Sequence, residues 1–362
     1  MKFDYLIVGA GPFGSVFARR MTDAGASCLV IDKRKHIAGN CYTERKNDID
    51  VHKYGAHIFH TSNKQVWSYV NRFADFNSYR HHLKVNHKNK IYSFPINMMT
   101  LHQLWGVITP EEAARKIQEV RIPIESPSNL EDWVLSQVGE EIYEKFIKGY
   151  TEKQWGRPAK DLPSSIIKRL PIRMSYNDCY FNDPYQGIPK CGYTEMFSRI
   201  LKGIPVELGV DYLKHRDKLD YCATKVVYTG ALDEFFEYDS GILDWRSLSF
   251  EEQEMDGDYQ GVSVMNYTEA SVPYTRIVEH KYFNYTEQSS TVITKEYPQK
   301  WSVGLDKIYP VNNKRNGDLY LSYKKRVDRS KYILGGRLAD YQYYDMHQAI
   351  GSALSKSSRE IK

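Results

Sequence analysis

Three side chains at helical spacing are suited to binding a nucleotide. Phe146, Tyr150 and Gln154 are each four residues apart, so a helix would place them in one stripe. The aromatic rings can stack on a base, the amide can read its edge, and the guanidinium of Arg169 can fork onto phosphate. The alternative is an amphipathic helix whose aromatic side chains fill a core, and the spacing alone favours that interpretation.

A glycine-rich turn near the N-terminus predicts a dinucleotide site. The turn GAGPFG follows an apolar strand pattern and opens a helical pattern, and a second strand pattern ends at Asp32. Gly9 suits the tight turn, Gly11 lets backbone approach a pyrophosphate, and Gly14 lets helix and strand pack closely. Asp32 can accept hydrogen bonds from ribose hydroxyls. The strand, helix and acidic residue in register make the motif far more specific than its glycines alone.

The segment after the second strand favours a flavin over a nicotinamide cofactor. Arg34, Gly39 and Asn40 lie in a second glycine-bearing turn, similar to that of FAD enzymes of the glutathione-reductase type. His57 and His60 follow in another glycine-containing segment. We interpret them as solvated or capping residues, because no carboxylate or cysteine is suitably spaced near them for a metal site. The sequence therefore predicts no metal.

The totals fit a globular protein of two or three structural units, with 362 residues, 26% charged and 41% apolar. The net charge of +5 is too mild to predict a nucleic-acid partner but would help with an anionic small substrate. Five scattered cysteines without a CxxC motif predict free thiols in a reducing compartment. No apolar run reaches membrane-spanning length, so we expect a cytoplasmic protein.

The elements that must position these residues form a dinucleotide domain with insertions. Residues 61–180 are largely helical, and such an insertion commonly supplies a substrate wall. Residues 258–297 are rich in Tyr and Val, so they look like antiparallel strands, and they place Arg276 on a strand or at its end. A short strand then runs into two glycines and Arg337, and a helix begins near Asp345. This second glycine-rich turn before a helix suits a cofactor's diphosphate or flavin edge.

Eight motifs, in order over nearly the whole chain, resemble those of bacterial UDP-galactopyranose mutases. They are GAGPFG from Gly9, GN from Gly39, YGAHIFHT from Tyr54, KGYTEKQWG from Lys148, KRLPIR from Lys168, YQGIPKCGYT from Tyr185, VPYTRIVEHKYF from Val272 and GGRLADYQYYDMHQ from Gly335. The fourth and seventh are far more specific than a nucleotide fingerprint. On the basis of this resemblance, we expect the stripe at 146–154 to line the substrate site and not to fill a core.

The resemblance implies a flavin-dependent isomerase that interconverts UDP-galactopyranose and UDP-galactofuranose without net redox change. The implied cofactor is FAD, active when reduced, with N5 as nucleophile on the anomeric carbon. An external reductant such as NAD(P)H would prime it, and the protein would be a homodimer serving galactofuranose biosynthesis for a cell-surface polysaccharide. UDP-N-acetylgalactosamine stays open as a further substrate, because Ala56 stands where proline is common.

The implied fold class is α/β, with an FAD-binding, Rossmann-like doubly wound domain, a helical insertion domain and a twisted antiparallel sheet domain. The expected FAD-binding domain comprises residues 1–77, 181–236 and 311–362. The expected helical substrate domain comprises 98–170, and the expected sheet domain comprises 78–97, 171–180 and 237–310. Two departures from the family pattern are Ala38, in place of a common glycine, and Ile147, in place of a possible second aromatic residue.

The resemblance also implies roles for individual residues. The implied catalytic residues are Arg169, Arg276, Asp345 and His57, with both arginines clamping the diphosphate. The implied substrate-binding residues are Phe146, Tyr150, Gln154, Trp155, Asn97, Tyr180, Tyr309 and Tyr343, with Tyr150 stacking on uracil. The implied cofactor-binding residues are Gly9, Gly11, Phe13, Gly14, Asp32, Lys33, Gly39, Asn40, His57, Ile58, Arg337, Tyr344, Asp345 and Met346.

Two other functions fit parts of the pattern. A flavin oxidase or desaturase could use a similar fold, but it would need an apolar or amine substrate tunnel, and two arginines aimed at one site argue against that. A catalytically idle nucleotide-sugar-binding protein would keep the substrate wall without loading FAD. The fold alone does not separate these functions.

Overall fold

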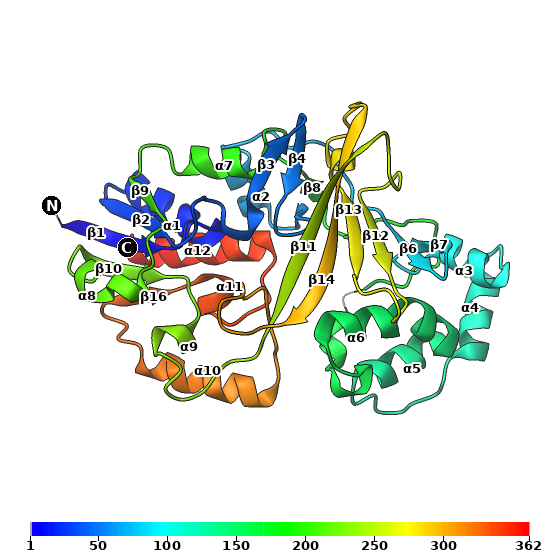
Figure 1. Cartoon of the computed structure of the whole chain (residues 1–362). Coiled ribbons are helices and arrows are strands. Elements are labelled where there is room, and N and C mark those ends of the chain that lie inside the picture. Colours follow the sequence, from blue (N-terminus) through cyan, green and yellow to red (C-terminus); the bar gives the residue numbers. More distant parts are fainter. Residues whose placement is uncertain (1, 169, 362) are drawn as a thin grey trace.

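The computed structural model describes residues 2–168 and 170–361, which form two large sheets and a group of helices (Figure 1). In Figure 1 the first sheet and its helices lie on the left, the long strands of the second sheet cross the centre, and helices α3 to α6 lie on the right. The predicted α/β fold class is confirmed. Arg169, one of the two arginines predicted to clamp a diphosphate, lies outside the described residues.

The first sheet is parallel and carries the glycine-rich turn. Its five strands are, in spatial order, β16 (Tyr332–Leu334), β10 (Ala223–Tyr228), β1 (Phe3–Val8), β2 (Cys28–Asp32) and β9 (Val206–Leu208). All five residues of β2 are buried, because helices and loops cover both faces of a parallel sheet and favour continuous apolar strands. Helix α1 (Pro12–Asp23) follows β1 and packs against α12 (Met346–Glu360).

The third glycine of the first turn is there for close packing. A Cβ atom at Gly14 would lie 1.9 Å from the carbonyl oxygen of Gly9, so any side chain would push α1 away from the turn. Pro12 occupies the first turn of α1, where its missing N–H costs nothing. The sequence motif therefore encodes the approach of α1 to the end of β1, as predicted.

The second sheet is mixed, with mostly antiparallel pairs. Its seven strands are, in spatial order, β15 (Tyr309–Pro310), β11 (Trp245–Asp256), β14 (Ser290–Lys300), β13 (Arg276–Glu279), β12 (Val264–Tyr267), β6 (Leu83–His87) and β7 (Lys90–Phe94). One pair, β12 with β6, is parallel, which differs from the purely antiparallel sheet that we expected. These two strands come from segments far apart in the sequence, so a hairpin connection does not force them antiparallel.

The helices after β7 form the group on the right of Figure 1. They are α3 (Met98–Trp105), α4 (Pro110–Val120), α5 (Leu130–Ile142), the π-helix η2 (Tyr143–Lys148) and α6 (Gly149–Trp155). Helix α4 begins at the capping box that its sequence predicts. Thr109 Oγ1 accepts a hydrogen bond from the Glu112 amide at 3.2 Å, and Glu112 Oε2 accepts one from the Thr109 amide at 3.1 Å.

The predicted single α-helical stripe at 146–154 is wrong, because η2 is a π-helical turn directly before α6. Its wider i to i+5 hydrogen bonds break the regular spacing of four residues. Phe146 is 2% exposed, and its ring lies edge-on to Tyr92 with centroids 5.2 Å apart. Phe146 therefore packs in the core while Tyr150 lies half-buried on α6. The base contact of Phe146 stays a prediction.

Shorter strands and helices complete the structure. They include the strand pairs β3 (Thr43–Lys46) with β4 (Ile49–His52) and β5 (Phe59–Thr61) with β8 (Tyr185–Gly187), and the helices α2 (Lys64–Val70), α7 (Gly192–Ile200), α8 (Arg216–Leu219), α9 (Leu232–Phe235), α10 (Lys314–Arg326) and α11 (Gly336–Ala339). All five cysteines lie in the described ranges, and none forms a disulfide, as predicted. Within the described ranges, each helix is too short or too polar to cross a membrane.

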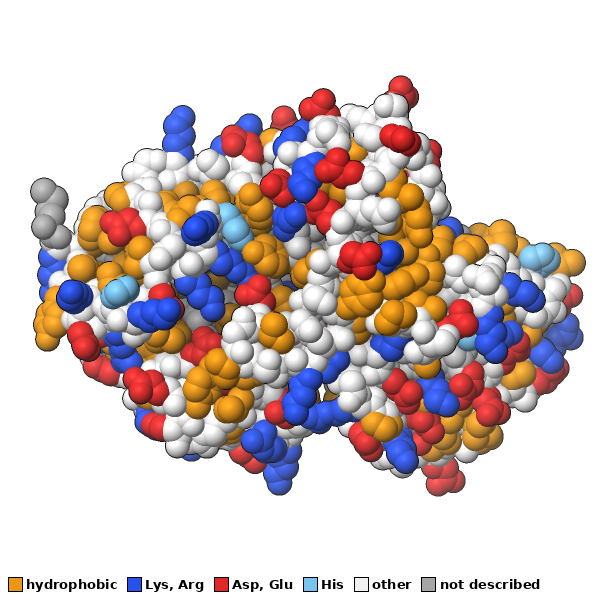
Figure 2. Space-filling model, in the orientation of Figure 1, with side chains coloured by type: hydrophobic (Ala, Val, Ile, Leu, Met, Phe, Trp, Pro, Cys, Tyr) orange, Lys and Arg blue, Asp and Glu red, His pale blue; other side chains and the backbone are white. Residues whose placement is uncertain are grey.

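Acidic and basic side chains are interspersed over the face shown in Figure 2. A different arrangement occurs in the interior near the first sheet, where Lys307 and Asp233 form a buried ion pair. Their atoms Nζ and Oδ1 are 3.0 Å apart, and the side chains are 3% and 0% exposed. The ammonium also lies 4.5 Å from the centre of the Trp301 ring. Burial raises the pKa of Asp233, and Lys307 counteracts this effect.

We expect Lys307→Met to lower the free energy of unfolding by about 3–5 kcal/mol, because it leaves a buried carboxylate without its cation. Equilibrium unfolding in urea measures this loss. The matched control is Lys116→Met, which breaks the solvent-exposed pair of Lys116 with Glu119 and should change stability by less than about 1 kcal/mol. Equal effects of both substitutions would contradict the role of the buried pair.

Candidate functional site

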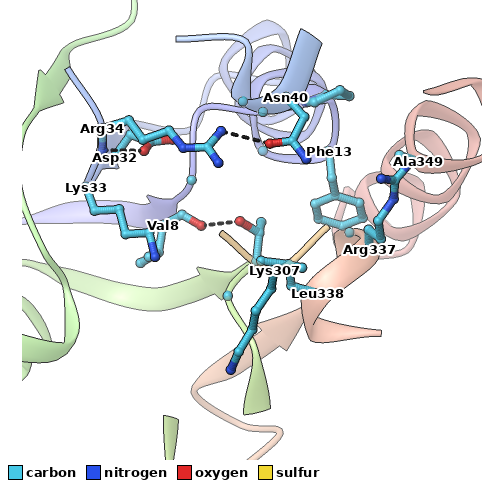
Figure 3. A pocket seen from close by; sticks show the side chains of 18 of the residues that line it. Val8, Phe13, Asp32, Lys33, Arg34, Asn40, Lys307, Arg337, Leu338 and Ala349 are labelled. Atoms are coloured by element: carbon cyan, nitrogen blue, oxygen red, sulfur yellow. Dashed lines mark hydrogen bonds between the residues drawn. The ribbon is translucent and has the colours of Figure 1, made fainter. Parts of the chain in front are cut away.

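A cavity of about 380 Å³ lies at the carboxyl ends of the parallel strands (Figure 3). This is where open parallel sheets bind their ligands. All but one of the predicted cofactor-binding residues line it, namely Gly9, Gly11, Phe13, Gly14, Asp32, Lys33, Gly39, Asn40, His57, Arg337, Tyr344, Asp345 and Met346. The exception is Ile58, which is not among the lining residues.

Asp32 ties the two glycine-bearing turns to β2. Its Oδ2 accepts a hydrogen bond from the Ala10 amide at 2.8 Å, and its Oδ1 accepts one from the Arg34 amide at 2.8 Å. Because the carboxylate is 8% exposed and each oxygen has a second lone pair, it can still accept from a ligand hydroxyl. Asp32 is thus a scaffold for the turns as well as a candidate ribose ligand.

Thr229 and Asp306 also line the cavity, and the sequence motifs did not predict them. Arg34 donates to Asn40 Oδ1 at 2.8 Å, as drawn in Figure 3, and forms an ion pair with Asp306 at 2.9 Å. Thr229 Oγ1 donates to the Val8 carbonyl at 2.7 Å and also lines the cavity. The turn after β10, Thr229-Gly230, was the local signal that could have added Thr229.

The lining fits a dinucleotide with a central diphosphate. Gly11 caps α1 without any side chain that accepts from the first-turn amides, so these amides are available to an anion. Lys33 and Arg337 add two cationic side chains to the lining, whereas the ammonium of Lys307 is paired with Asp233 and Glu234. The apolar ring of Phe13 also lines the cavity. The residues present therefore fit a dinucleotide cofactor, the class to which FAD belongs.

A second cluster joins α6 to the mixed sheet. The Arg276 guanidinium, on β13, donates a hydrogen bond to the Tyr150 hydroxyl and pairs with Glu296 Oε2 at 3.3 Å. The Glu296 side chain is 3% exposed, and burial raises its pKa although Arg276 counteracts this. A buried carboxylate thereby fixes a cation beside an aromatic ring. This pair of groups is suited to a phosphate and a base of one ligand.

Two features hold α6 against the loop that leads to Arg276. Lys153 Nζ donates to the carbonyls of Tyr267, Val272 and Tyr274 at 2.8, 2.9 and 3.0 Å, and burial lowers the pKa of Lys153 to about 8. A Cβ atom at Gly149 would lie 2.1 Å from the Thr268 carbonyl oxygen, so only glycine permits this approach. The motif KGYTEKQWG therefore encodes docking of α6 as well as ligand contacts.

The predicted tyrosines gather near the same cluster. Tyr309 stacks on Tyr343, with ring centroids 5.2 Å apart. Burial and the neighbouring Tyr343 raise the pKa of Tyr309 far above its usual value, while Arg276 opposes the shift. Tyr180 lies close enough to Tyr150 to help raise the pKa of the Tyr150 hydroxyl, for which burial is the main cause. These side chains would present hydroxyl groups to a ligand held by Arg276.

Asn97 has a structural role that the sequence analysis did not predict. Its Oδ1 accepts from the amides of Met99 and Thr100, and its Nδ2 donates to Ser93 Oγ and the Pro95 carbonyl. The side chain is fully buried, so it caps α3 with all its hydrogen bonds used. A substrate contact of Asn97 would require one of these bonds to break, and it stays a prediction. Gln154 and Trp155 lie half-buried at the end of α6.

Several histidines near the site are neutral in the folded protein. Burial lowers the pKa of His57, which lines the cavity, to about 4, and its Nδ1 lies 2.8 Å from the Gly55 carbonyl. Burial lowers the pKa of His81 and of His280 to about 3. Since the folded state resists protonation of these rings, acid must favour the unfolded chain.

We expect the free energy of unfolding to fall as the pH drops from 6.5 toward 4. Above pH 6.5, His81 and His280 are neutral in both states. Below it, the unfolded chain binds protons that the folded chain does not, which costs about 1.4 kcal/mol of stability per pH unit for each histidine. Urea unfolding at several pH values gives the slope. His81→Gln should make it shallower, exposed His215→Gln should not, and an unchanged slope in His81→Gln would contradict the account.

Comparison with known proteins agrees with this geometry. A family model described as UDP-galactopyranose mutase matches residues 145–343, and one described as NAD(P)-binding Rossmann-like domain matches residues 7–73. A dTDP-fucopyranose mutase from Escherichia coli is 38% identical, with 99% of this chain and 98% of the relative covered. A probable UDP-galactopyranose mutase from Klebsiella pneumoniae is 42% identical, with 96% and 92% covered.

A crystal structure of reduced UDP-galactopyranose mutase superposes with a TM-score of 0.77 at 13% identity, covering all of this chain and 94% of that one, which shows a shared fold. The family model spans more than half of the chain, and the relatives above 30% identity cover nearly all of it. The resemblance stated from the motifs is thus confirmed, and the chain belongs to the UDP-galactopyranose mutase family of isomerases.

Proposed function

We propose that this isomerase interconverts UDP-galactopyranose and UDP-galactofuranose with bound FAD. The observation that carries the proposal is the Tyr150–Arg276–Glu296 cluster. It places an aromatic ring beside a guanidinium that is paired with a buried carboxylate. Family membership supplies the reaction class, and the cavity of the parallel sheet supplies a place for the cofactor. We further propose a cytoplasmic homodimer, primed by an external reductant such as NAD(P)H, that provides galactofuranose for a cell-surface polysaccharide.

When bound and reduced, FAD would supply N5 as the nucleophile for the anomeric carbon. The protein's own part is to hold the leaving diphosphate and stabilise its charge. Arg276 can bind two diphosphate oxygens at once, because a guanidinium presents parallel N–H donors. Arg169 is proposed as the second clamp. A preorganised cation gains strength in a site shielded from water, and Glu296 keeps Arg276 oriented before the charge develops.

Aromatic and hydroxyl groups would position the rest of the substrate. Tyr150 is proposed to stack on uracil, because an aromatic side chain can stack on the flat face of a base. Lys153 anchors α6, the helix that carries Tyr150. Tyr180, Tyr309 and Tyr343 would donate hydroxyl hydrogen bonds to the diphosphate as it departs and returns. Asp345 and His57 line the cavity and would face the sugar near the cofactor.

A second substrate is favoured by one relative. The Escherichia coli relative, 38% identical over almost its full length, is named for dTDP-fucopyranose. The same arginine clamp would hold the diphosphate of dTDP-fucopyranose, because this compound differs from UDP-galactopyranose only in the nucleoside and in the substituents of the sugar. UDP-N-acetylgalactosamine is the third candidate. The flavin oxidase alternative is not favoured, since the relatives that match the whole chain are named as mutases.

The test is incubation of the FAD-loaded protein with UDP-galactofuranose under dithionite, with chromatography of the products. We expect UDP-galactopyranose to form only when the flavin is reduced. The parallel reactions with dTDP-fucofuranose and the N-acetylated sugar nucleotide rank the three substrates by kcat/KM. Failure with all three, with FAD demonstrably bound and reduced, would contradict the proposed function.

We expect Arg276→Ala to lower kcat/KM by about 10²–10³-fold while FAD stays bound, because the variant loses a preorganised charge at the leaving group. Arg276→Lys should recover only part of the loss, since an ammonium cannot fork onto two oxygens. Steady-state kinetics and the absorbance of bound flavin measure the two quantities. The matched control is Arg199→Ala on the exposed side of α7, which should leave both unchanged. Normal turnover in Arg276→Ala would exclude the clamp.

A further inference from the structure

Three potential metal ligands meet beside the cavity, although they are far apart in the sequence. His60 lies on β5, and Asp345 and His347 lie at the start of α12. One ligand atom from each lies within 4.8 Å of the others. His60 Nε2 and Asp345 Oδ2 are 3.8 Å apart, and the rings of His60 and His347 are 4.7 Å apart between centroids. The fold thus supplies the carboxylate that the local sequence around His60 lacks.

A second carboxylate fixes the orientation of His60. Asp183 Oδ2 lies 2.6 Å from His60 Nδ1, so Nδ1–H donates to Asp183 and Nε2 is the ring nitrogen that faces Asp345. The His60 ring also stacks on Phe181 at 3.6 Å between centroids, which limits its rotation. A carboxylate behind a histidine, with the free nitrogen directed at other donors, is the arrangement that supports metal ligands in proteins.

The remaining histidine has a nitrogen that the structure does not use. His347 Nδ1 is buried and has no hydrogen-bond partner. A buried polar atom without a partner costs free energy, so such an atom in a native structure calls for an explanation. A ligand held jointly with His60 and Asp345 provides one.

We propose that His60, Asp345 and His347 form a binding site for a divalent first-row metal ion of the Zn²⁺ type, with Asp183 as the supporting carboxylate. Two imidazoles and one carboxylate suit Zn²⁺, whereas Mg²⁺ prefers oxygen ligands. Zn²⁺ bonds of about 2.0–2.2 Å hold ligand atoms roughly 3.4 Å apart, so the side chains must close by about 1 Å. The remaining coordination position would hold water, as in sites with three protein ligands.

The electrostatics and the position of the site decide its effect. The amide dipoles at the start of α12 oppose a cation, and the carboxylates of Asp345 and Asp183 outweigh this partial charge. Asp345 also lines the cavity, so a bound ion would hold its carboxylate away from the cavity ligand. A bound ion would therefore inhibit turnover by holding Asp345 away from the reaction, and this effect rests on the proposed function. Binding of the ion itself does not depend on that function.

The test is calorimetric titration of the chelator-treated, FAD-loaded protein with ZnSO₄. We expect one Zn²⁺ per chain, and we expect affinity to fall at least about tenfold in His347→Gln, which removes a ligand, and in Asp183→Ala, which removes its support. His102→Gln, which changes an exposed histidine on α3, is the matched control and should bind Zn²⁺ normally. Mg²⁺ in excess should not compete.

Co²⁺ substitution separates this site from the free cysteines, because thiolate ligation gives an intense near-ultraviolet charge-transfer band that imidazole and carboxylate ligands do not. We expect the visible Co²⁺ bands without that band. No uptake of Zn²⁺, or equal uptake in His347→Gln, Asp183→Ala and the control, would overturn the proposal. Thermal unfolding shows whether each variant is folded. Because two independent variants are used, the test remains decisive if one of them does not fold.

Discussion

The candidate active site depends on one buried ion pair, Arg276 with Glu296. Glu296 lies on the long strand β14, its side chain is almost completely shielded from water, and it has a charged partner in Arg276. A buried carboxylate without a cation is expensive, so the pair holds the guanidinium at the start of β13. Arg276 in turn donates a hydrogen bond to the hydroxyl of Tyr150, which links α6 to the start of β13. The groups proposed to bind the ligand are therefore held in place by contacts within the protein itself.

A separate set of contacts keeps α6 in register with that pair. Lys153, one turn after Tyr150, satisfies three carbonyls of the loop before β13, and Gly149 allows the helix backbone to touch the same loop. Since an ammonium group has three donors and all three are used, the loop cannot shift without leaving buried polar groups unpaired. The helix, the loop and Arg276 consequently form one unit that can hold a base and a diphosphate at a fixed separation.

The sequence predicted best what local chemistry determines. The turn at Gly9 to Gly14 and the acceptor at Asp32 depend on neighbouring residues, so their motif placed these residues in the cavity lining correctly. It could not predict Thr229, Lys307 or the partners of His60, because the fold brings these from distant segments. Helical spacing also did not predict the π turn at η2, which alters the spacing between Phe146 and α6. The capping role of Asn97 was missed because it depends on where α3 begins, and its substrate contact stays a prediction.

The central claim is that Tyr150 and Arg276 bind the nucleoside and the diphosphate of one ligand. The most direct measurement is a crystal structure of the FAD-loaded protein with UDP. The account predicts uracil stacked on Tyr150 and diphosphate oxygens within hydrogen-bond distance of the Arg276 guanidinium, with the Glu296 pair intact. UDP bound elsewhere, with Tyr150 and Arg276 still joined only to each other, would contradict it.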